Sequence, residues 1–369
     1  MTSRIPALLI ALAIHSPGGS VAQDAAPRAV WVGGLEYRSV SVQRLVGAHR
    51  IRQAALPLGF ELARGRLSLD AGVSFASSTL TRRDGTAHTV SNLTDGQLRA
   101  SYVFGRDAVV ATLMVNLPTG PAEASAQDHA VIGAVSPAFL AFPAPVYASG
   151  LSIVGGVATA VEAGEWSIGL AGSLKVSDRF TPYRDALGPL SYKPGVEGRV
   201  RAGADGLVGS SQLTLGLTLS TFGTDQLGAG GTIAGEYQPG TRLIAEGSLN
   251  APLGSSALNL SAWSFYRSAG DTANVTAANQ EHLLGGSAMV VVPVGHSISL
   301  MPRVEGRHST PRFGSGRWLG TGLGLRFDVT DAIGFHPSVR YDRGRVTDAS
   351  GGSTPFRGWN ASAYIRVEH

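Results

Sequence analysis

The stretch from Arg317 to Asp342 shows a two-residue alternation that is typical of β-strands. In its first arm the apolar side chains share one parity, while glycine and charged residues share the other. The second arm begins at Ile333, after a very short polar turn, and repeats the pattern. Successive side chains of a strand point to opposite faces, so each arm has one apolar and one polar face. The two arms are therefore expected to pair as an antiparallel hairpin.

The same alternation recurs along almost the whole chain and predicts about 16 strands, with about 14 to 18 compatible with the pattern. Short turns are expected at Arg64, Arg106, Ala163, Asp205, Leu253, Gly295 and Asp331. Between them lie longer connections, which include the polar stretches 77–95, 178–193, 223–240 and 271–280. Short periplasmic turns and long external loops are the asymmetry of an outer-membrane barrel. A water-soluble β-sandwich or propeller is the alternative, but it does not account for this regular alternation of loop length.

The composition also favours a barrel that crosses a membrane with strands. Of 369 residues, only 15% are charged and 49 are glycine, and the mean hydropathy is +0.11. A soluble domain usually carries roughly 25% charged residues. Beyond the N-terminal segment, no apolar run reaches the ~20 residues that a membrane helix needs. In a barrel, polar lumen-facing residues dilute apolar lipid-facing ones, so the predicted fold class is all-β, a transmembrane antiparallel up-and-down β-barrel.

The N-terminus is typical of an export signal. Arg4 precedes a short apolar segment, and small residues up to Ala22 fit a cleavage site before Gln23. A buried N-terminal strand or helix is the alternative. The sequence is thus divided into three predicted parts: a signal peptide (residues 1–22), an N-terminal lead-in (residues 23–34) and an outer-membrane β-barrel (residues 35–369).

The longest connection runs from Pro121 to about Tyr147 and contains an apolar segment, Ala138 to Phe142. Loops of this length are usually functional or disordered. An apolar loop could fold into the mouth of the barrel, or it could pack against a neighbouring loop on the surface. The sequence alone leaves both interpretations open.

Two short motifs in neighbouring predicted strands carry a family resemblance. Val115 to Gly120 reads Val-Asn-Leu-Pro-Thr-Gly at a strand end, and Asn92 to Leu98 leads into the preceding strand. The pair resembles the V-x-L-P-T-G exit and G-L-x-D entry of FadL-like and phenol-degradation-pathway (MetA-type) outer-membrane transporters, with Asn92 in place of the entry glycine. FadL-type proteins carry a substantial N-terminal plug, whereas only a short segment precedes the first strand predicted here. The resemblance implies uptake of small hydrophobic or aromatic molecules through a monomeric barrel, and its motif residues are Asp95, Pro118, Thr119 and Gly120.

The predicted orientation of the wall places charged residues inside and aromatic residues at the membrane interfaces. An arginine that faces lipid at mid-membrane costs roughly 2–4 kcal/mol, so charges are expected on the lumen side. These arginines could form an eyelet that attracts anionic solutes, or they could be neutralised by acidic neighbours and simply fill the interior. The lumen candidates are Arg199, Arg201, Arg242, Glu246, Arg303, Glu305, Arg307, Arg326, Asp328, Arg340, Asp342, Arg366 and Glu368. An interfacial girdle, or less plausibly a sugar-stacking surface, is predicted for Trp31, Tyr102, Trp166, Trp318, Tyr341 and Trp359.

No enzymatic, cofactor or metal site is expected. The histidines lie on different predicted strands or loops, and no Ser–His–acid arrangement or metal-ligand spacing occurs. The chain has no cysteine, so it lacks a thiolate site. The glycines at 320, 322 and 324 lie in mid-strand, where they are expected to relieve crowding rather than to bind phosphate. The net charge of +4 comes without a basic cluster interleaved with aromatics, so no nucleic-acid partner is expected.

The expected partners are outer-membrane lipid, a small-molecule solute and the outer-membrane assembly machinery. The last strand resembles the assembly signal of such barrels, with His369 where a terminal aromatic residue usually stands. The predicted function is passive uptake of small, hydrophobic or aromatic molecules across the outer membrane of a Gram-negative-type bacterium. A structural or adhesive barrel with a filled lumen is the alternative from another class.

Overall fold

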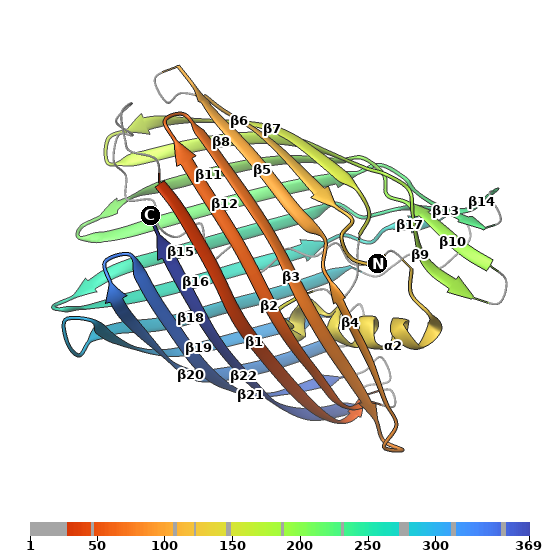
Figure 1. Ribbon diagram of the computed structural model, residues 1–369. Coiled ribbons are helices and arrows are strands. Elements are labelled where there is room, and N and C mark those ends of the chain that lie inside the picture. The colour runs from red at the N-terminus through yellow and green to blue at the C-terminus, as the bar shows by residue number, and fades with distance from the viewer. Residues whose placement is uncertain are drawn as a thin grey trace.

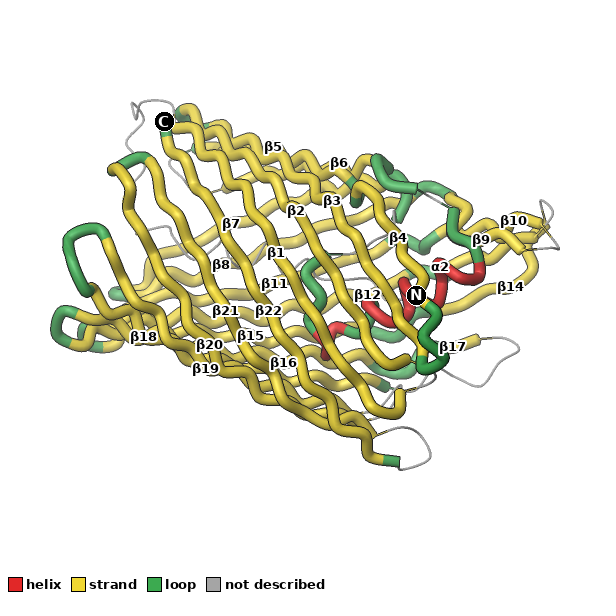
Figure 2. The backbone as a smooth tube through the Cα atoms, turned by 60° about the horizontal axis from the view of Figure 1, so that its bottom comes forward, coloured by secondary structure: helices red, strands yellow, loops and turns green. Residues whose placement is uncertain are grey.

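The computed structural model describes residues 28–45, 48–105, 109–121, 123–144, 149–185, 188–229, 232–272, 280–310, 315–347 and 352–369. The chain forms a closed antiparallel barrel of 16 wall positions (Figures 1 and 2). Its wall strands are β1 (Arg28–Leu45), β2 (Ala48–Arg64), β3 (Leu67–Arg82), β4 (Ala87–Leu93), β5 (Gly96–Phe104), β6 (Val109–Leu117), β7 (Ser152–Ala163), β8 (Trp166–Ser177), β11 (Glu197–Val208), β12 (Ser211–Phe222), β15 (Arg242–Leu253), β16 (Ser256–Arg267), β18 (Glu281–Pro293), β19 (Ile298–Thr310), β20 (Ser315–Thr330), β21 (Ile333–Thr347) and β22 (Ser353–Glu368).

The barrel closes where the two ends of the chain meet. β1 pairs with β2 on one side and with β22 on the other, and both pairings are antiparallel. β4 and β5 follow one another along β3, so together they fill one position in the wall. The predicted hairpin is confirmed as β20 and β21, and the predicted strand number and fold class are confirmed as well.

Alternation decides which side of the wall each residue faces. Along β12, Leu215, Leu217 and Leu219 are each close to half exposed on the outside, whereas Thr218 and Ser220 are buried inside. The same pattern holds around the barrel, where Leu, Ile and Val side chains make up most of the exposed outer surface. Such a surface is unfavourable in water but suits the apolar band of a transmembrane barrel.

The structure corrects several predicted boundaries. β1 begins at Arg28, so residues 28–34 belong to the wall and not to a lead-in; residues 1–27 lie outside the described residues. The predicted polar loop 77–95 is mostly strand, because its serines and threonines pair across β3 and β4. The turn predicted at Asp205 lies instead between β11 and β12, at Gly209 with φ +65°. Asp205 lies inside β11 and faces the lumen, and a polar residue at such a position resembles a turn signal.

Three predicted loops contain strands of a second sheet. β9 (Phe180–Asp185), β10 (Gly188–Lys193), β13 (Asp225–Ala229), β14 (Thr232–Gln238) and β17 (Asp271–Thr272) form a five-stranded sheet in the order β17-β14-β13-β10-β9. This sheet extends the barrel beyond the wall at the end opposite the C-terminus (Figure 1). Not every outer connection is long, since β19 ends at Thr310 and β20 begins at Ser315.

Two helical segments follow β6. They are α2 (Ala126–Val135) and the short 3-10 helix η1 (Ala138–Leu140). Within the described part of the chain, no helix is both long enough and apolar enough to cross a membrane.

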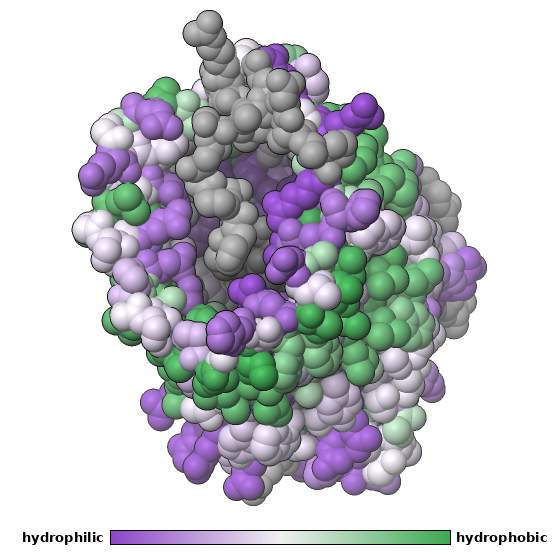
Figure 3. All heavy atoms as spheres, turned by 60° about the vertical axis from the view of Figure 1, so that its left-hand side comes forward, coloured by the Kyte–Doolittle hydropathy of each residue, from purple (hydrophilic) through white to green (hydrophobic). Residues whose placement is uncertain are grey.

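The outer surface and the turns give the orientation in the outer membrane. The turns between β2 and β3, β7 and β8, and β20 and β21 are short and lie at the end of the barrel where the C-terminus lies, which is the periplasmic end. Figure 3 looks at this end and shows hydrophilic residues around a hollowed mouth, with a hydrophobic flank on the outside. The protein is an outer-membrane β-barrel that crosses the membrane many times.

The outward parity predicts a sharp difference between neighbouring positions of β12. Leu217→Arg places a charge on the lipid face and is expected to lower the free energy of unfolding by roughly 2–4 kcal/mol. Thr214→Arg faces the lumen beside Asp205, which already accepts a hydrogen bond from Thr214, and should change stability by less than about 1 kcal/mol. Urea unfolding in lipid vesicles measures both variants. Equal losses would contradict the assigned faces.

Candidate functional site

A cluster of arginines lines the lumen around one glutamate of β19. Glu305 is almost fully buried and accepts hydrogen bonds from Arg303 at 2.9 Å and from Arg307 at 2.9 and 3.1 Å. Arg340 of β21 also donates to Glu305. The two-residue spacing of 303, 305 and 307 places the three side chains on one face of β19, and register brings β21 within reach. Most of the predicted lumen residues on this wall therefore form one charged network.

A fully buried ion pair between β1 and β21 extends the network. Nη1 of Arg38 lies 2.8 Å from Oδ2 of Asp342, and neither side chain is exposed to solvent. Asp342 also accepts a hydrogen bond from Nε of Arg340 at 2.8 Å. A buried guanidinium is costly to desolvate, so Arg38 depends on this carboxylate.

Trp318 stands at the centre of this cluster. The guanidinium carbons of Arg340, Arg307 and Arg38 lie 5.0, 5.4 and 5.8 Å from its ring centroid, distances at which cations are attracted to an indole face. The prediction that Trp318 belongs to an interfacial girdle is wrong. Its parity is that of the glycines of β20, which faces the lumen, and its side chain is only 4% exposed. Trp31 and Trp359, on the outward parity, are more than half exposed.

The apolar segment of the long connection folds into the barrel and docks on this cluster. Nη1 of Arg307 donates to the carbonyl oxygen of Ala138 at 2.7 Å, and Nε1 of Trp318 donates to the carbonyl oxygen of Phe139 at 2.7 Å. Farther along, the Gln53 side chain donates to the carbonyl oxygen of Ala144 at 2.7 Å and accepts from its amide at 3.0 Å. Of the two interpretations left open by the sequence, the inward one is correct. We call residues 123–144 the inward loop.

The inward loop packs against an apolar part of the lumen. Val131 and Val135 of α2 and Leu140 of η1 join a buried cluster with Val40 and Ile51 of the wall. The expectation that polar residues line the lumen is therefore incomplete. In their extracellular halves, β1, β2 and β3 present apolar side chains to the lumen. The helix α2 covers these side chains with its own apolar residues, so both surfaces are shielded from water inside the barrel.

The start of α2 is fixed by a capping box and by a link to the wall. The Ser125 side chain accepts from the amide of Asp128, whose carboxylate accepts from the Ser125 amide. Nε2 of His88 on β4 lies 2.7 Å from Oδ1 of Asp128. Burial disfavours the charged carboxylate, but the bonds from His88 and Ser125 outweigh it and hold the pKa of Asp128 below its usual value.

Glycines leave the space that the docked loop and its partners occupy. A Cβ at Gly316 would lie 2.6 Å from the Phe139 ring, and a Cβ at Gly320 would clash with Oδ1 of Asp342. A Cβ at Gly322 would lie 2.7 Å from the carbonyl oxygen of Val339. The interpretation of these strand glycines as positions that relieve crowding is confirmed.

A second charged network lies on the wall formed by β11, β12 and β15. Glu197 accepts from Nη2 of Arg199 at 2.8 Å and also from Arg242, and both Glu197 and Arg242 are buried. Nearer the periplasmic end, Arg201 pairs with Glu246 and donates to Oγ1 of Thr218 at 3.1 Å. These predicted residues come together across three strands because their parities match in register.

The motif residues meet at an interruption in the wall. Thr119 Oγ1 accepts from the Gly96 amide at 2.8 Å and donates to the Thr94 carbonyl oxygen at 2.7 Å. Asp95 accepts from Nδ2 of Asn116 at 3.0 Å and from the Ser149 hydroxyl at 2.8 Å. These bonds tie the break between β4 and β5 to the end of β6 and the start of β7, where Pro118 and Gly120 lead the chain out of the wall.

Beyond this junction the hydrogen-bonded wall is interrupted. β5 pairs with both β3 and β6, whereas β4, among the described residues, pairs with β3 alone. The space between β4 and β9 is crossed by the inward loop: α2 packs against both strands, and Ala124 forms a parallel bridge with Tyr183 (Figures 1 and 2). A helix thus stands where a further strand pairing would otherwise continue the wall.

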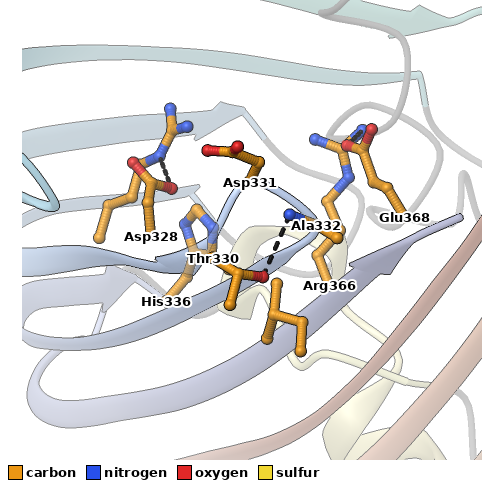
Figure 4. A pocket seen from close by; sticks show the side chains of 10 residues that line it. Asp328, Thr330, Asp331, Ala332, His336, Arg366 and Glu368 are labelled. Atoms are coloured by element: carbon orange, nitrogen blue, oxygen red, sulfur yellow. Dashed lines mark hydrogen bonds and ion pairs between the residues drawn. The ribbon is translucent and has the colours of Figure 1, made fainter.

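The remaining predicted residues lie at the periplasmic mouth. Arg326, Asp328 and Arg366, with Glu368 and His336, line a recess of about 250 Å³ beside the turn between β20 and β21 (Figure 4). Nε of Arg326 donates to Oδ1 of Asp328 at 2.8 Å, and Arg366 pairs with Glu368. This recess is far along the strands from the arginine cluster around Trp318, so the predicted residues do not form one ring.

Each predicted lumen arginine pairs with a carboxylate, and sequence reasoning missed several residues that hold these pairs together. The pairs are Arg199 and Arg242 with Glu197, Arg201 with Glu246, Arg303, Arg307 and Arg340 with Glu305, Arg326 with Asp328, and Arg366 with Glu368. The missed residues are Arg38, Gln53, Trp318 and Glu197. Arg38 could have been found, since the apolar Leu35 and Tyr37 mark the outward parity of its strand and Arg38 has the opposite one. In the described ranges, no group of His, Asp and Glu side chains is arranged to hold a metal ion.

Solved structures with similar architecture are outer-membrane proteins. The loop L8 deletion mutant of OmpT, an outer membrane protein of Vibrio cholerae, matches with a TM-score of 0.45 and 11% identity over 94% of this chain and 100% of that one. The CymD monoaromatic hydrocarbon channel matches with a TM-score of 0.45 and 10% identity over 92% of this chain and 88% of that one. An outer membrane channel from Pseudomonas putida F1 matches with a TM-score of 0.40 and 10% identity over 96% and 100% of the two chains.

No protein-family profile matches the sequence, and no curated protein matches it either. Likenesses of this size carry no argument about substrate. The assignment of a barrel rests on the strand pairing of the chain itself.

Proposed function

We propose that the protein is a channel for the passive uptake of small molecules, in particular hydrophobic or aromatic ones, and that it is a relative of the FadL-like and MetA-type transporters. The observation that carries the proposal is the inward loop. A barrel of 16 strands encloses an aqueous channel when nothing fills it. Among the described residues, the inward loop narrows that space. It packs apolar side chains against β1 to β3, and its backbone carbonyls accept hydrogen bonds from Arg307 and Trp318 on β19 and β20.

The interrupted wall supports a route for apolar solutes. α2 packs against β3 and β4, where β4 pairs with β3 alone among the described residues, and the buried residues of α2 are Val131 and Val135. A solute that passes between α2 and β4, beside the contact of His88 with Asp128, leaves the lumen on the lipid side without crossing the arginine networks of the wall. The hydrogen bonds of the motif residues Asp95 and Thr119 hold the wall together at the periplasmic boundary of this route. These residues therefore have a structural role beside the proposed route.

A structural or adhesive barrel remains the second candidate, and one observation favours it. The inward loop is anchored at two separate places on the wall, by Gln53 on β2 and by Arg307 and Trp318 on β19 and β20, with β1, β22 and β21 between them. A loop held at both places cannot swing aside, so in this candidate it blocks the lumen. In that case neither ions nor neutral solutes pass.

The two candidates differ in solute uptake. Cells that lack the protein are expected to take up a small neutral aromatic such as phenol several-fold more slowly than cells in which the intact chain is restored. Uptake of a hydrophilic sugar of similar size is expected to change less, because the route along α2 is apolar. Radiolabelled solute accumulation at low external concentration measures both rates.

Single-channel recording in planar bilayers completes this test. A route that leaves the barrel through the wall gives little ionic conductance while phenol uptake stays fast. Uptake that is equal with and without the protein, together with no conductance, would favour the filled barrel and reject the channel.

A further inference from the structure

The outer face of the barrel changes from apolar to cationic at the extracellular end of four strands. On β21 the lipid-facing residues run from Ile333 through Val339 to Tyr341, and the next two are Arg343 and Arg345. On the same outward face, the apolar residues give way to Arg317 on β20, to Arg357 on β22, and to Arg52 and Arg50 on β2. We call these six residues the outer arginine patch: Arg50, Arg52, Arg317, Arg343, Arg345 and Arg357.

Strand register places these arginines directly beside one another. Arg317 is opposite Arg345, Arg343 is opposite Arg357, and Ser41 of β1 lies between Arg357 and Arg50. Directly opposed residues on one face have Cβ atoms about 4.5–5.5 Å apart, and like charges at this distance are destabilising. An arrangement of two opposed arginine pairs therefore needs compensation.

The described part of the chain supplies no acidic partner to this patch. None of its arginines takes part in an ion pair there, and all are exposed except Arg50, which is half-buried and donates to Oγ of Ser41 at 3.3 Å. This contrasts with the lumen, where every predicted arginine has a carboxylate beside it. The described residues thus leave these arginines open to a counter-charge from outside the protein.

The height of the patch indicates what lies next to it. From Ile333 to Arg343 a strand rises by about 33 Å, and a tilt of about 40° reduces this to about 25 Å across the membrane. That height equals the apolar band of a transmembrane barrel, about 25 Å. Directly below Arg343 and Arg357, Tyr341 and Trp359 pack with ring centroids 4.8 Å apart, as expected at a membrane interface. The patch therefore lies at the headgroup level of the outer leaflet.

We propose that the outer arginine patch is a binding site for the phosphate groups of a phosphorylated glycolipid of the outer leaflet, of the lipid A class. Guanidinium groups bind phosphate oxygens in a bidentate manner, and adjacent arginines can hold one phosphate between them. The acyl chains of the same lipid lie along the apolar residues below, on β20, β21 and β22. This site lies on the lipid side of the wall and is independent of the proposed channel.

The patch is local, which distinguishes a site from a general property of the rim. Near the extracellular end of the opposite wall, one row of directly paired outward residues consists of Val200, Leu219, Leu243 and Tyr266. No arginine occurs in that row. The proposed phosphate site lies across the seam where β1 meets β22, and this row of the opposite wall has no equivalent arginines.

Native mass spectrometry of the intact detergent-solubilised protein tests the site with bis-phosphorylated lipid A as the probe. Replacing Arg343 and Arg357 together by glutamine is expected to weaken lipid A binding at least tenfold. Replacing Arg64 and Arg66 by glutamine, at the periplasmic turn after β2, removes the same charge and should leave binding unchanged. Dephosphorylated lipid A, with the same acyl chains, should bind the unaltered protein at least tenfold more weakly than the phosphorylated form.

Three outcomes overturn the proposal. The first is equal binding of lipid A to the unaltered protein and to the Arg343/Arg357 variant, when both migrate as folded barrels in SDS gel electrophoresis of unheated samples. The second is equal binding of phosphorylated and dephosphorylated lipid A to the unaltered protein, which needs no variant. The third is complete displacement of lipid A by low-millimolar inorganic phosphate, which would make the patch a site for soluble anions.

Discussion

Replacing Asp342 by asparagine is expected to lower the free energy of unfolding by about 3–5 kcal/mol, because it leaves a fully buried guanidinium without its counter-charge. Arg38 lies 2.8 Å from Asp342, and both side chains are completely shielded from solvent. The ring of Trp318 attracts this guanidinium but does not neutralise it. Reversible urea unfolding in lipid vesicles, followed by tryptophan fluorescence, measures the loss.

A second substitution shows whether the loss comes from the orphaned charge. Arg38→Met combined with Asp342→Asn removes both charges, keeps a side chain of similar length and leaves an acceptor for Arg340. Breaking one partner of a buried pair is costly, whereas replacing both is often nearly neutral, so the double variant should recover most of the stability. If the double variant is as unstable as the single one, the ion pair is not what Asp342 contributes.

The wall of the barrel could be predicted from the sequence because each strand repeats the same physical choice. Lipid outside and a polar interior force a period of two, and a run such as Leu213 to Leu219 satisfies it with little ambiguity. Most short turns could be found because the strands must reverse there; the turn predicted at Arg106 lies outside the described residues. Asp205 shows the limit, since a single polar residue facing the lumen resembles a turn signal as long as its neighbours across the sheet are unknown.

The residues that line the lumen could be predicted only in part, because their polarity depends on which segment of the chain packs against them. Val40 and Ile51 face inward and are apolar, which contradicts the simple rule of a polar lumen, yet the inward loop supplies the apolar surface that covers them. Whether a loop turns inward depends on contacts between distant residues, such as Arg307 with Ala138 or Gln53 with Ala144. The prediction for Trp318 was wrong although the sequence contained the necessary signal. Its parity indicated the lumen, but its residue type suggested a membrane interface.

Removing the inward loop is expected to raise single-channel conductance by roughly threefold or more, because a barrel of this strand number without a filling loop encloses an aqueous channel. The variant replaces residues 124–144 with a short Gly-Ser linker and keeps Asp95, Thr119 and Ser149, so the hydrogen bonds that brace the wall junction remain. Planar bilayer recording compares it with the unaltered protein.

The anchors of the inward loop separate the effect of its docking from that of its presence. Gln53→Ala with Trp318→Ala keeps the loop but removes its side-chain bonds to Ala144 and Phe139, so the conductance should fluctuate between the levels of the unaltered and loop-deleted proteins. Shortening the hairpin of β13 and β14, which extends beyond the wall, is the matched control and should leave the conductance unchanged. If all these variants conduct alike, the loop does not limit passage. The narrow point of the barrel must then lie elsewhere along the lumen.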